Sequence, residues 1–345
     1  MFSFKKLQIP VIQAPMAGGI TTQSLVAAVA NAGGIGSFGF AYDPPDKIDR
    51  SLSGIRRLTR GMVNANFFIF DSTSLPTLYS RKRAIATLRG LNYARDQIPD
   101  DIKVPFSQNL DDQLHPIWHH RPNILTFHLG VPKKRIIDKA KSMGICVGIT
   151  ATSLEEAQKI KNVGADFVVA QGVEAGGHRG VFDQKSFDQR LSMTTLVKTI
   201  QRNVVIPVVG AGGIMNGGDI KITLREGAIA AQMGTAFLCC RESGAPPSYK
   251  EYLLAKRSRK VVFTKSFSGR LAQGIENEFI KRMDSKPILP FPAQNVLTSG
   301  LRKFSAINDN GEYQSLWAGR GFVQMRRMSA KGLMSILKKE MGIDS

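Results

Sequence analysis

The sequence predicts a (β/α)8 TIM barrel with a second, smaller helical domain. Eight short, apolar, β-rich runs alternate with amphipathic stretches of helical periodicity. Such runs are typical of a parallel sheet that helices cover on both faces, and eight such units indicate a closed barrel. The 345 residues also exceed the usual size of a single core. A doubly wound open sheet is the alternative.

Each strand candidate except the last has a helix candidate behind it. The strands are expected at residues 11–15, 34–40, 62–70, 124–130, 145–150, 166–172, 206–213 and 228–235. The helices are expected at residues 21–32, 46–60, 79–97, 132–144, 153–164, 192–203 and 217–227. The change from short apolar runs to a 3.6-residue period decides each assignment.

Two segments interrupt this alternation. Residues 71–123 combine a helical stretch with the Pro- and His-containing loop HPIWHHRPN, so we expect an insertion that covers the barrel mouth. Residues 243–311 indicate a small helical domain that caps the substrate site. The barrel is therefore expected to comprise residues 1–242 and 312–345, with its last helix at 329–342.

Composition and charge bear on location and partners. Lys and Arg number 47 against 27 Asp and Glu, a net charge of +20. The basic clusters at 81–83, 133–135 and 256–260 are dispersed and lack interleaved aromatic residues, which favours solvated surface over a nucleic-acid site. Three cysteines give no disulfide framework, and no apolar run is long enough for export or a membrane span. We expect a soluble, cytoplasmic protein whose charge attracts small anions.

Glycine-rich motifs end the seventh and eighth strands. GAGGI covers residues 210–214 and QMGT covers residues 232–235. Barrels commonly bind phosphate at these two loops, where glycine lets backbone N–H groups approach the oxygens. A phosphate joined to a planar ring over the barrel mouth suits flavin mononucleotide (FMN). The chain has neither a GxGxxG motif that opens a helix nor a P-loop.

The histidines differ in context. His178 lies in AQGVEAGGHRG, at the end of the sixth strand, where glycine-rich backbone can aim its side chain into the barrel mouth. An imidazole there suits a base or a group that holds an anion. His128 suits either a core or a site residue. His119 and its neighbours are expected in a surface loop, with no metal site, and Cys146 is expected in the core rather than as a nucleophile.

Together these motifs resemble those of the class I nitronate monooxygenases, formerly called 2-nitropropane dioxygenases. The matching stretches are QAPMAGG, AVANAGGIGSFGF, VNANFF, FHLGVP, AQGVEAGGHRGVF, VVGAGGI, QMGTAFL and SLWAGRG. The resemblance runs from about residue 9 to the C-terminus.

The resemblance implies an FMN enzyme that oxidises alkyl nitronates, such as propionate 3-nitronate, with O2 to carbonyl compounds plus nitrite and nitrate. It places the active-site histidine at His178, which either deprotonates a nitroalkane or holds the anionic nitronate. A monomer or a homodimer is expected. The implied flavin contacts are Met16, Asn66, Gln171, Gly176, Gly213, Gln232, Met233, Gly234 and Thr235.

Two alternatives stay open. One shares the fold and FMN: an NAD(P)H-dependent reductase of quinones or enoyl thioesters. The other is a barrel without catalysis that binds a nucleotide or phosphate, or a basic nucleic-acid-binding protein. Fold alone does not separate these functions.

Overall fold

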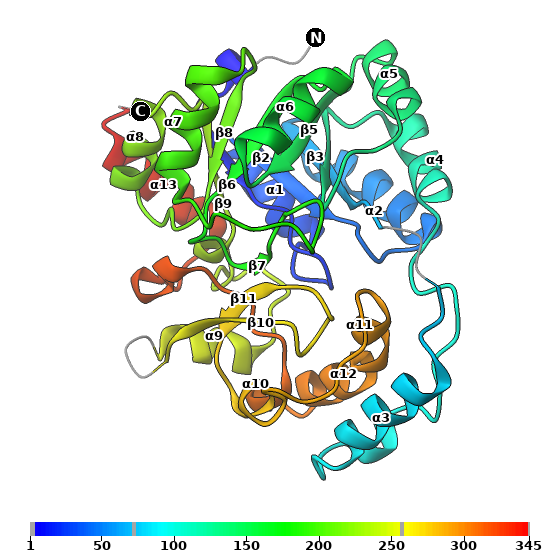
Figure 1. Cartoon of the computed structure of the whole chain (residues 1–345). Helices are drawn as coiled ribbons and strands as arrows, with labels where there is room; N and C mark the ends of the chain where they lie inside the picture. Colours follow the sequence, from blue (N-terminus) through cyan, green and yellow to red (C-terminus); the bar gives the residue numbers. More distant parts are fainter. Residues whose placement is uncertain (1–3, 71–73, 256–258, 344–345) are drawn as a thin grey trace.

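Eight parallel strands form a closed barrel in the computed structural model, which describes residues 4–70, 74–255 and 259–343 (Figure 1). The barrel closes where Ile12 of the first strand pairs with Gln232 of the last. The predicted (β/α)8 barrel is therefore confirmed, and the open sheet is wrong. In barrel order, the strands are β1 (Val11–Gln13), β2 (Ile35–Gly39), β3 (Met62–Phe68), β4 (Ile124–His128), β5 (Cys146–Ala151), β6 (Phe167–Gln171), β8 (Val208–Ala211) and β9 (Ala230–Met233).

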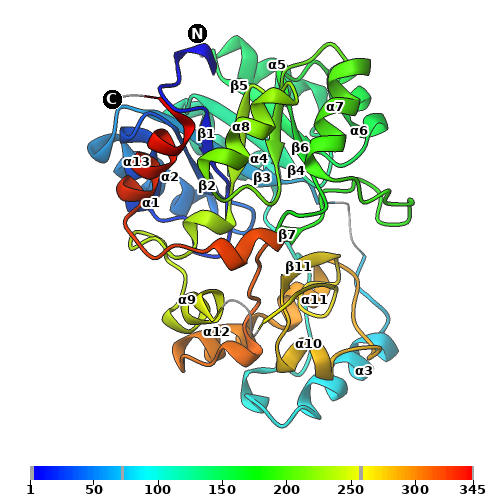
Figure 2. The same ribbon diagram turned by 90° about the vertical axis from the view of Figure 1, so that its left-hand side faces the viewer.

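Helices surround the barrel, and their apolar faces pack on its strands. The last of them, α13, packs against both α1 and α8, so the C-terminal helix fills the place that the sequence left without a helix behind the eighth strand. Both described ends of the chain lie on the same side of the barrel, away from the second unit (Figures 1 and 2). The surrounding helices are α1 (Gln23–Asn31), α2 (Pro45–Leu58), α4 (Leu110–His120), α5 (Lys134–Ser142), α6 (Leu154–Val163), α7 (Met193–Asn203), α8 (Gly217–Arg225) and α13 (Ala330–Met341).

One local expectation is wrong. The HPIWHH stretch is not a surface loop, because it forms most of α4, which packs against α2. Proline inside a helix removes a backbone hydrogen bond. Here the helix buries Leu114, Pro116 and Ile117 on one face, and Asn109 caps its first turn by accepting from the N–H of Asp111. This burial and the cap outweigh the cost of Pro116.

The second unit lies below the barrel in Figure 1 and contains strands as well as helices. A three-stranded antiparallel sheet has the order β10, β11, β7. Its third strand is β7 (Gly177–His178), which comes from the barrel loop after β6, so the sheet joins the two parts of the chain. The other elements are α9 (Pro247–Leu254), β10 (Val261–Thr264), β11 (Ala272–Ile275), α10 (Glu278–Arg282), α11 (Ala293–Leu297) and α12 (Ser299–Ile307).

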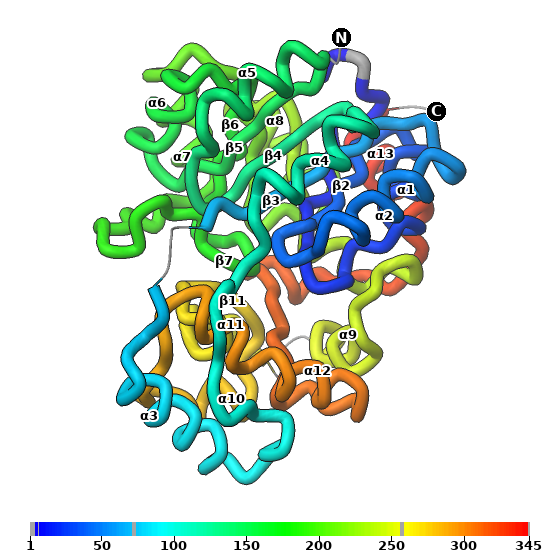
Figure 3. The backbone as a smooth tube through the Cα atoms, turned by 90° about the vertical axis from the view of Figure 1, so that its right-hand side faces the viewer, coloured from blue at the N-terminus to red at the C-terminus, as the bar shows by residue number. Residues whose placement is uncertain are grey.

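The first part of the insertion after β3 packs with the second unit, whereas its last helix, α4, belongs to the barrel. Helix α3 (Leu78–Arg89), in the first part, lies beside α10 (Figure 3). Buried Ile85, Leu88 and Phe106 belong to one apolar cluster with Phe267 and Phe279. Residues 71–73, at the start of the insertion, and residues 256–258, in the last basic cluster, lie outside the described residues.

Two further apolar clusters make up the barrel core. The larger one joins the outward side chains of the strands to the surrounding helices. The smaller one includes Ile12, Ile35, Phe167 and Val169, which alternate with outward-facing residues as expected for a barrel interior. The Phe167 ring fills the space beside Gly148, where an added Cβ would lie 2.1 Å from the ring. The interior is therefore packed at the level of these residues, and a cavity lies toward the carboxyl ends of the strands.

Candidate active site

A cavity of about 590 Å³ lies between the carboxyl ends of the barrel strands and the second unit. Its lining contains histidine, arginine and lysine side chains but no aspartate or glutamate among the described residues. All the residues predicted for the site line this one cavity: Met16, Asn66, Gln171, Gly176, His178, Gly213, Gln232, Met233, Gly234 and Thr235. The structure thus brings together residues that are up to 219 positions apart (235 − 16).

The loops after β8 and β9 form one end of the cavity. Gly212 and Gly213 have φ values of +129° and +73°, a conformation that favours glycine. The backbone N–H groups of Gly213, Ile214 and Thr235 donate to no described residue. Unpaired N–H groups that converge from two loops form a cradle for an anion such as a phosphate.

A ladder of buried polar side chains crosses the barrel just below the cavity. Ser37 donates its N–H to Oε1 of Gln13 at 2.9 Å, and Asn64 donates to Oγ of Ser37 at 3.1 Å. Thr126 donates to Oδ1 of Asn64 at 3.0 Å and accepts from Asn66 at 2.9 Å. The ladder fixes the amide of Asn66, whose Oδ1 keeps its acceptor capacity at the cavity wall.

Gln171, at the end of β6, holds the loop that carries His178. Its Nε2 donates to the carbonyl of His178 at 3.0 Å, and its Oε1 accepts from the N–H of Gly180 at 2.8 Å. Arg179 supports this arrangement because its Nη1 donates to the carbonyl of Gln171, while its other nitrogens form a two-point ion pair with Asp188. The side chain of Arg179 is only 3% exposed, so the ion pair anchors the loop from within.

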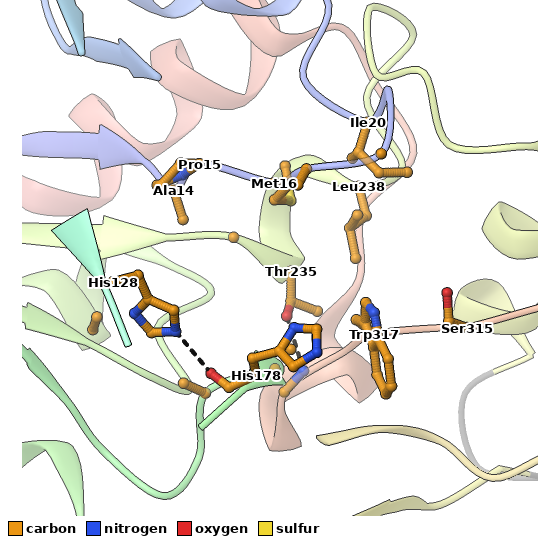
Figure 4. A pocket seen from close by; sticks show the side chains of 18 of the residues that line it. Ala14, Pro15, Met16, Ile20, His128, His178, Thr235, Leu238, Ser315 and Trp317 are labelled. Carbon is orange, nitrogen blue, oxygen red and sulfur yellow. Dashed lines mark hydrogen bonds between the residues drawn. The ribbon is translucent and has the colours of Figure 1, made fainter. Parts of the chain in front are cut away.

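The His178 imidazole lies where the barrel loop meets the second unit. β7 pairs His178 with Ala272 of β11, and Nε2 of His178 lies 2.9 Å from Oγ of Ser268. The rings of Phe68, Phe291 and Trp317 surround it at centroid distances of 5.6 to 5.7 Å. Figure 4 shows the imidazole beside Trp317, across the cavity from Met16 and Leu238.

His128 and His178, both half-buried at the cavity wall, are neutral over most of the pH range. Burial, together with the neighbouring His128, Arg270 and Arg302, lowers the pKa of His178 from 6.5 to about 3. Burial also lowers the pKa of His128 to about 4, although its hydrogen bond to the carbonyl of His178 acts in the opposite direction. That bond, 3.1 Å from Nε2 of His128, is drawn in Figure 4. His128 thus helps to fix the backbone of His178 through this hydrogen bond.

The other predicted residues lie along the wall in different ways. Met233 buries its side chain in the core, so only its backbone faces the cavity. Gly176 approaches the loop before the 3₁₀ helix η6 (Arg320–Gln324) so closely that an added Cβ would lie 2.4 Å from the carbonyl carbon of Ala318. The amide of Gln232 bonds no described residue and is free for a ligand. Oγ1 of Thr235 accepts from the N–H of Gly319 at 3.0 Å.

Sequence reasoning missed four residues at the site: Tyr42, Ser268, Arg302 and Trp317. Tyr42 and Arg302 line the cavity, and Ser268 bonds His178 from a segment 90 residues away. Trp317 belongs to SLWAGRG, and this motif was the only signal for any of the four. The other three stand in stretches without a recognisable pattern, so only the folded chain reveals them.

Several other candidates lie outside the site. Glu174 accepts from the N–H of Met193 at 3.0 Å and so caps the start of α7, a loop-orienting role. Burial raises the pKa of the Cys146 thiol to about 12, which leaves it unreactive. Within residues 4–70, 74–255 and 259–343 we find no cluster of three potential metal ligands. The helices in these ranges are too short or too polar to cross a membrane.

The fold and site define a class: a TIM-barrel enzyme whose cavity has no Asp or Glu among the described lining residues, with an anion cradle after the last two strands and a half-buried, neutral histidine. Comparison with known proteins gives the family. The family model for nitronate monooxygenase matches residues 1–340, so the chain belongs to the nitronate monooxygenase family and is an oxidoreductase.

Individual relatives agree with this assignment. The nitronate monooxygenase of Paraburkholderia phytofirmans is 35% identical over 338 residues, which cover 96% of this chain and 92% of the relative. That of Pseudomonas aeruginosa is 35% identical and covers 97% of both chains. The solved nitroalkane oxidase of Streptomyces ansochromogenes has a TM-score of 0.89 and 34% identity, covering 98% of this chain and 97% of its own. FabK of Thermotoga maritima, with a TM-score of 0.76 and 24% identity over 98% of this chain and 94% of its own, shares the fold.

Proposed function

We propose that the protein is an FMN-dependent nitronate monooxygenase that oxidises alkyl nitronates, such as propionate 3-nitronate, with O2 to carbonyl compounds plus nitrite and nitrate. The observation that carries the proposal is a single cavity that joins an anion cradle to a half-buried, neutral histidine and contains no carboxylate among the described residues. Such a cavity suits an anionic cofactor and an anionic substrate together. Residues 243–311 act in this proposal as the cap over the substrate.

The residues present fit FMN. The unpaired N–H groups of Gly213, Ile214 and Thr235 suit its phosphate. The free amide of Gln232 and Oδ1 of Asn66 suit the polar edge of a flavin ring. The apolar side chain of Met16 suits its face. When bound, FMN supplies the two-electron acceptor for the nitronate and the centre that reacts with O2.

Two tautomers correspond to the two roles considered for His178. Ser268 donates its hydroxyl hydrogen to the carbonyl of Arg270 at 3.1 Å, which leaves the hydroxyl oxygen to accept a hydrogen bond from Nε2–H of His178. Nδ1 is then an acceptor. If the hydroxyl instead turned toward Nε2, Nδ1 would carry the proton and donate to a substrate oxygen.

The low pKa of His178 favours preformed nitronates over neutral nitroalkanes. An imidazole whose conjugate acid has a pKa of about 3 is a weak base for an acidic carbon. A bound nitronate, in contrast, places a negative charge beside the ring and favours its protonated or donating form. In the proposed mechanism His178 therefore holds the nitronate oxygen and moves a proton only after the anion has bound. The surrounding rings of Phe68, Phe291 and Trp317 keep water from the reacting carbon.

Anaerobic reduction tests the proposal. Purified holoenzyme is mixed without O2 with propionate 3-nitronate, and separately with NADH and NADPH, while the visible absorbance of the flavin is followed. We expect the nitronate to bleach the flavin, and readmitted O2 to restore the absorbance with release of nitrite. Bleaching by a reduced nicotinamide alone would mark the protein as an NAD(P)H-dependent reductase and overturn the proposal. A preparation without flavin would support the non-catalytic alternative.

A further inference from the structure

Helix α3 has an outward side that the described chain leaves uncovered. The helix lies at the end of the second unit that points away from the barrel (Figures 1 and 3). Its buried side chains pack into the apolar cluster of that unit. The exposed side chains recur with the helical period on the opposite side. They are Leu78, Tyr79, Lys82, Arg83 and Ala86.

Large apolar side chains are exposed where this side of the helix begins. Four of them are between 43% and 70% exposed, namely Leu75, Leu78, Tyr79 and Val104. Arg81 holds the flanking segments against the helix, because it donates to the carbonyl of Pro76 at 2.6 Å and to both carboxylate oxygens of Asp101 at 2.6 and 3.0 Å. Scattered apolar side chains are ordinary on a protein surface, whereas several at one fixed place indicate an interaction site.

Basic side chains extend this surface. Residues 74–109 contain six lysines and arginines against three aspartates. Two of the aspartates, Asp100 and Asp101, pair with Arg89 and Arg81. The other basic side chains are exposed and pair with no acidic group in the part of the chain that the structure describes. They are Lys82, Arg83, Arg95 and Lys103. We call these four residues, together with the four exposed apolar residues, the α3 face.

A hollow of about 490 Å³ opens on the same side of α3. Lys82, Arg89 and Arg95 line it, and Asp100 is the one acidic residue in its described lining. Because Arg89 already pairs with Asp100 at 2.5 Å, Lys82 and Arg95 are left for an anionic group. Phosphate suits such a place, since lysine and arginine both bind it through charge-assisted hydrogen bonds.

We propose that the α3 face docks on an anionic phospholipid membrane. Leu78 and Tyr79 enter the boundary between headgroups and acyl chains, and the basic side chains contact the anionic headgroups. The net charge of +20 attracts the whole protein to such a surface. This role is separate from the reaction proposed for the barrel cavity, because none of these residues lines that cavity.

The charge and chemistry of the α3 face favour a membrane over other occupants. A second copy of the chain, bound through the same face, would bring like charges together across a two-fold axis. A nucleic acid would pair with the basic side chains but would leave the exposed leucines and Val104 without an apolar partner. A bilayer offers anionic groups and hydrocarbon at the same surface.

Co-sedimentation of the intact protein with lipid vesicles tests the proposal. We expect binding to phosphatidylcholine vesicles that contain phosphatidylserine, little binding to phosphatidylcholine alone, and weaker binding as salt is added. Lys82→Gln with Arg83→Gln should weaken binding by roughly 10- to 30-fold, since each basic side chain near an anionic membrane contributes about fivefold. Leu78→Ser with Tyr79→Ser should weaken it by about tenfold or more, through lost apolar burial.

Matched variants on the barrel are the controls. Lys331→Gln with Lys339→Gln removes the same charge from exposed positions of α13. Val205→Ser removes an apolar side chain that is 89% exposed. Both controls should bind the vesicles as wild type does. Circular dichroism of every variant should match wild type, which separates a loss of docking from a loss of fold.

Several results would overturn the proposal. Wild-type protein that ignores phosphatidylserine vesicles, or binds phosphatidylcholine alone equally well, has no such docking surface. Equal losses in the α3 and α13 charge variants would show that net charge acts rather than the α3 face. If the α3 variants kept vesicle binding but lost a dimer in sedimentation velocity, the face would belong to a second copy. If they lost only the retention of single-stranded DNA, it would belong to a nucleic acid.

Discussion

Acid should destabilise this protein in a way that depends on His128. The folded chain holds His128 neutral, with a pKa of about 4 against an ordinary 6.5. Between these two values the unfolded chain binds a proton that the folded chain does not. The free energy of unfolding therefore falls as the pH falls through this window, and it is fully retained above it.

The magnitude follows from the two pKa values. One pKa unit corresponds to about 1.4 kcal/mol. At pH 5 the unfolded imidazole is almost fully protonated and the folded one is almost fully neutral, which gives a loss of roughly 2 kcal/mol relative to pH 7.5. His178, with a pKa of about 3, adds a loss of similar size. These two losses form a large part of the stability of an ordinary domain.

Urea unfolding followed by circular dichroism at pH 7.5 and pH 5.0, at constant ionic strength, measures this effect. His128→Gln keeps a hydrogen-bond donor for the carbonyl of His178 but cannot titrate. The wild-type protein should lose roughly 2 kcal/mol more than this variant between the two pH values. His115→Asn, on the exposed face of α4, is the control and should behave as wild type. If wild type and His128→Gln lost equal stability, the buried neutral state of His128 would be refuted.

Three further predictions concern the site. His178→Ala should retain FMN but lose most nitronate turnover, measured as nitrite release, because it removes only the group that meets the substrate; an active variant would exclude the imidazole from the mechanism. Gly213→Ala should weaken FMN retention, measured by flavin absorbance after dialysis, because φ is +73° at the cradle; Gly144→Ala, with φ of +76° and open space around it, should strain the backbone equally and keep FMN. Arg179→Met should lower the free energy of unfolding by about 3–5 kcal/mol because it leaves Asp188 without its partner; unchanged urea unfolding would contradict the anchoring role.

The barrel could be predicted from the sequence because each strand has a recognisable pattern within its own few residues. Runs such as Phe167–Gln171 are apolar throughout and stand between amphipathic helices, and this pattern needs no distant partner to be recognised. The exception was α4, where Pro116 favoured a loop. The helix forms because burial of its apolar face against α2 outweighs the preference of proline for a loop. A short stretch of sequence does not reveal such packing, because the partner helix lies elsewhere in the chain.

The glycine motifs also indicated the correct end of the barrel, because the strands that they follow can be recognised from the sequence. Gly213 and Gly234 follow strands, so their place at the carboxyl end was fixed once the strands were counted. Ser268 and Arg302 carried no such signal, since a serine or an arginine is ordinary in a surface segment. Their importance arises only when residues far apart in the chain meet across the cavity.

The antiparallel pairing of β7 with β11 links the strand that carries His178 to the second unit. His178 hydrogen bonds Ser268 and faces Ala272 across the strand pair, so part of its surroundings comes from the second unit. A chimera that received residues 243–311 from a relative would exchange the histidine's partner along with the substrate contacts. Under the proposed function, a change in residues 243–311 therefore alters the surroundings of the imidazole together with the contacts to the substrate.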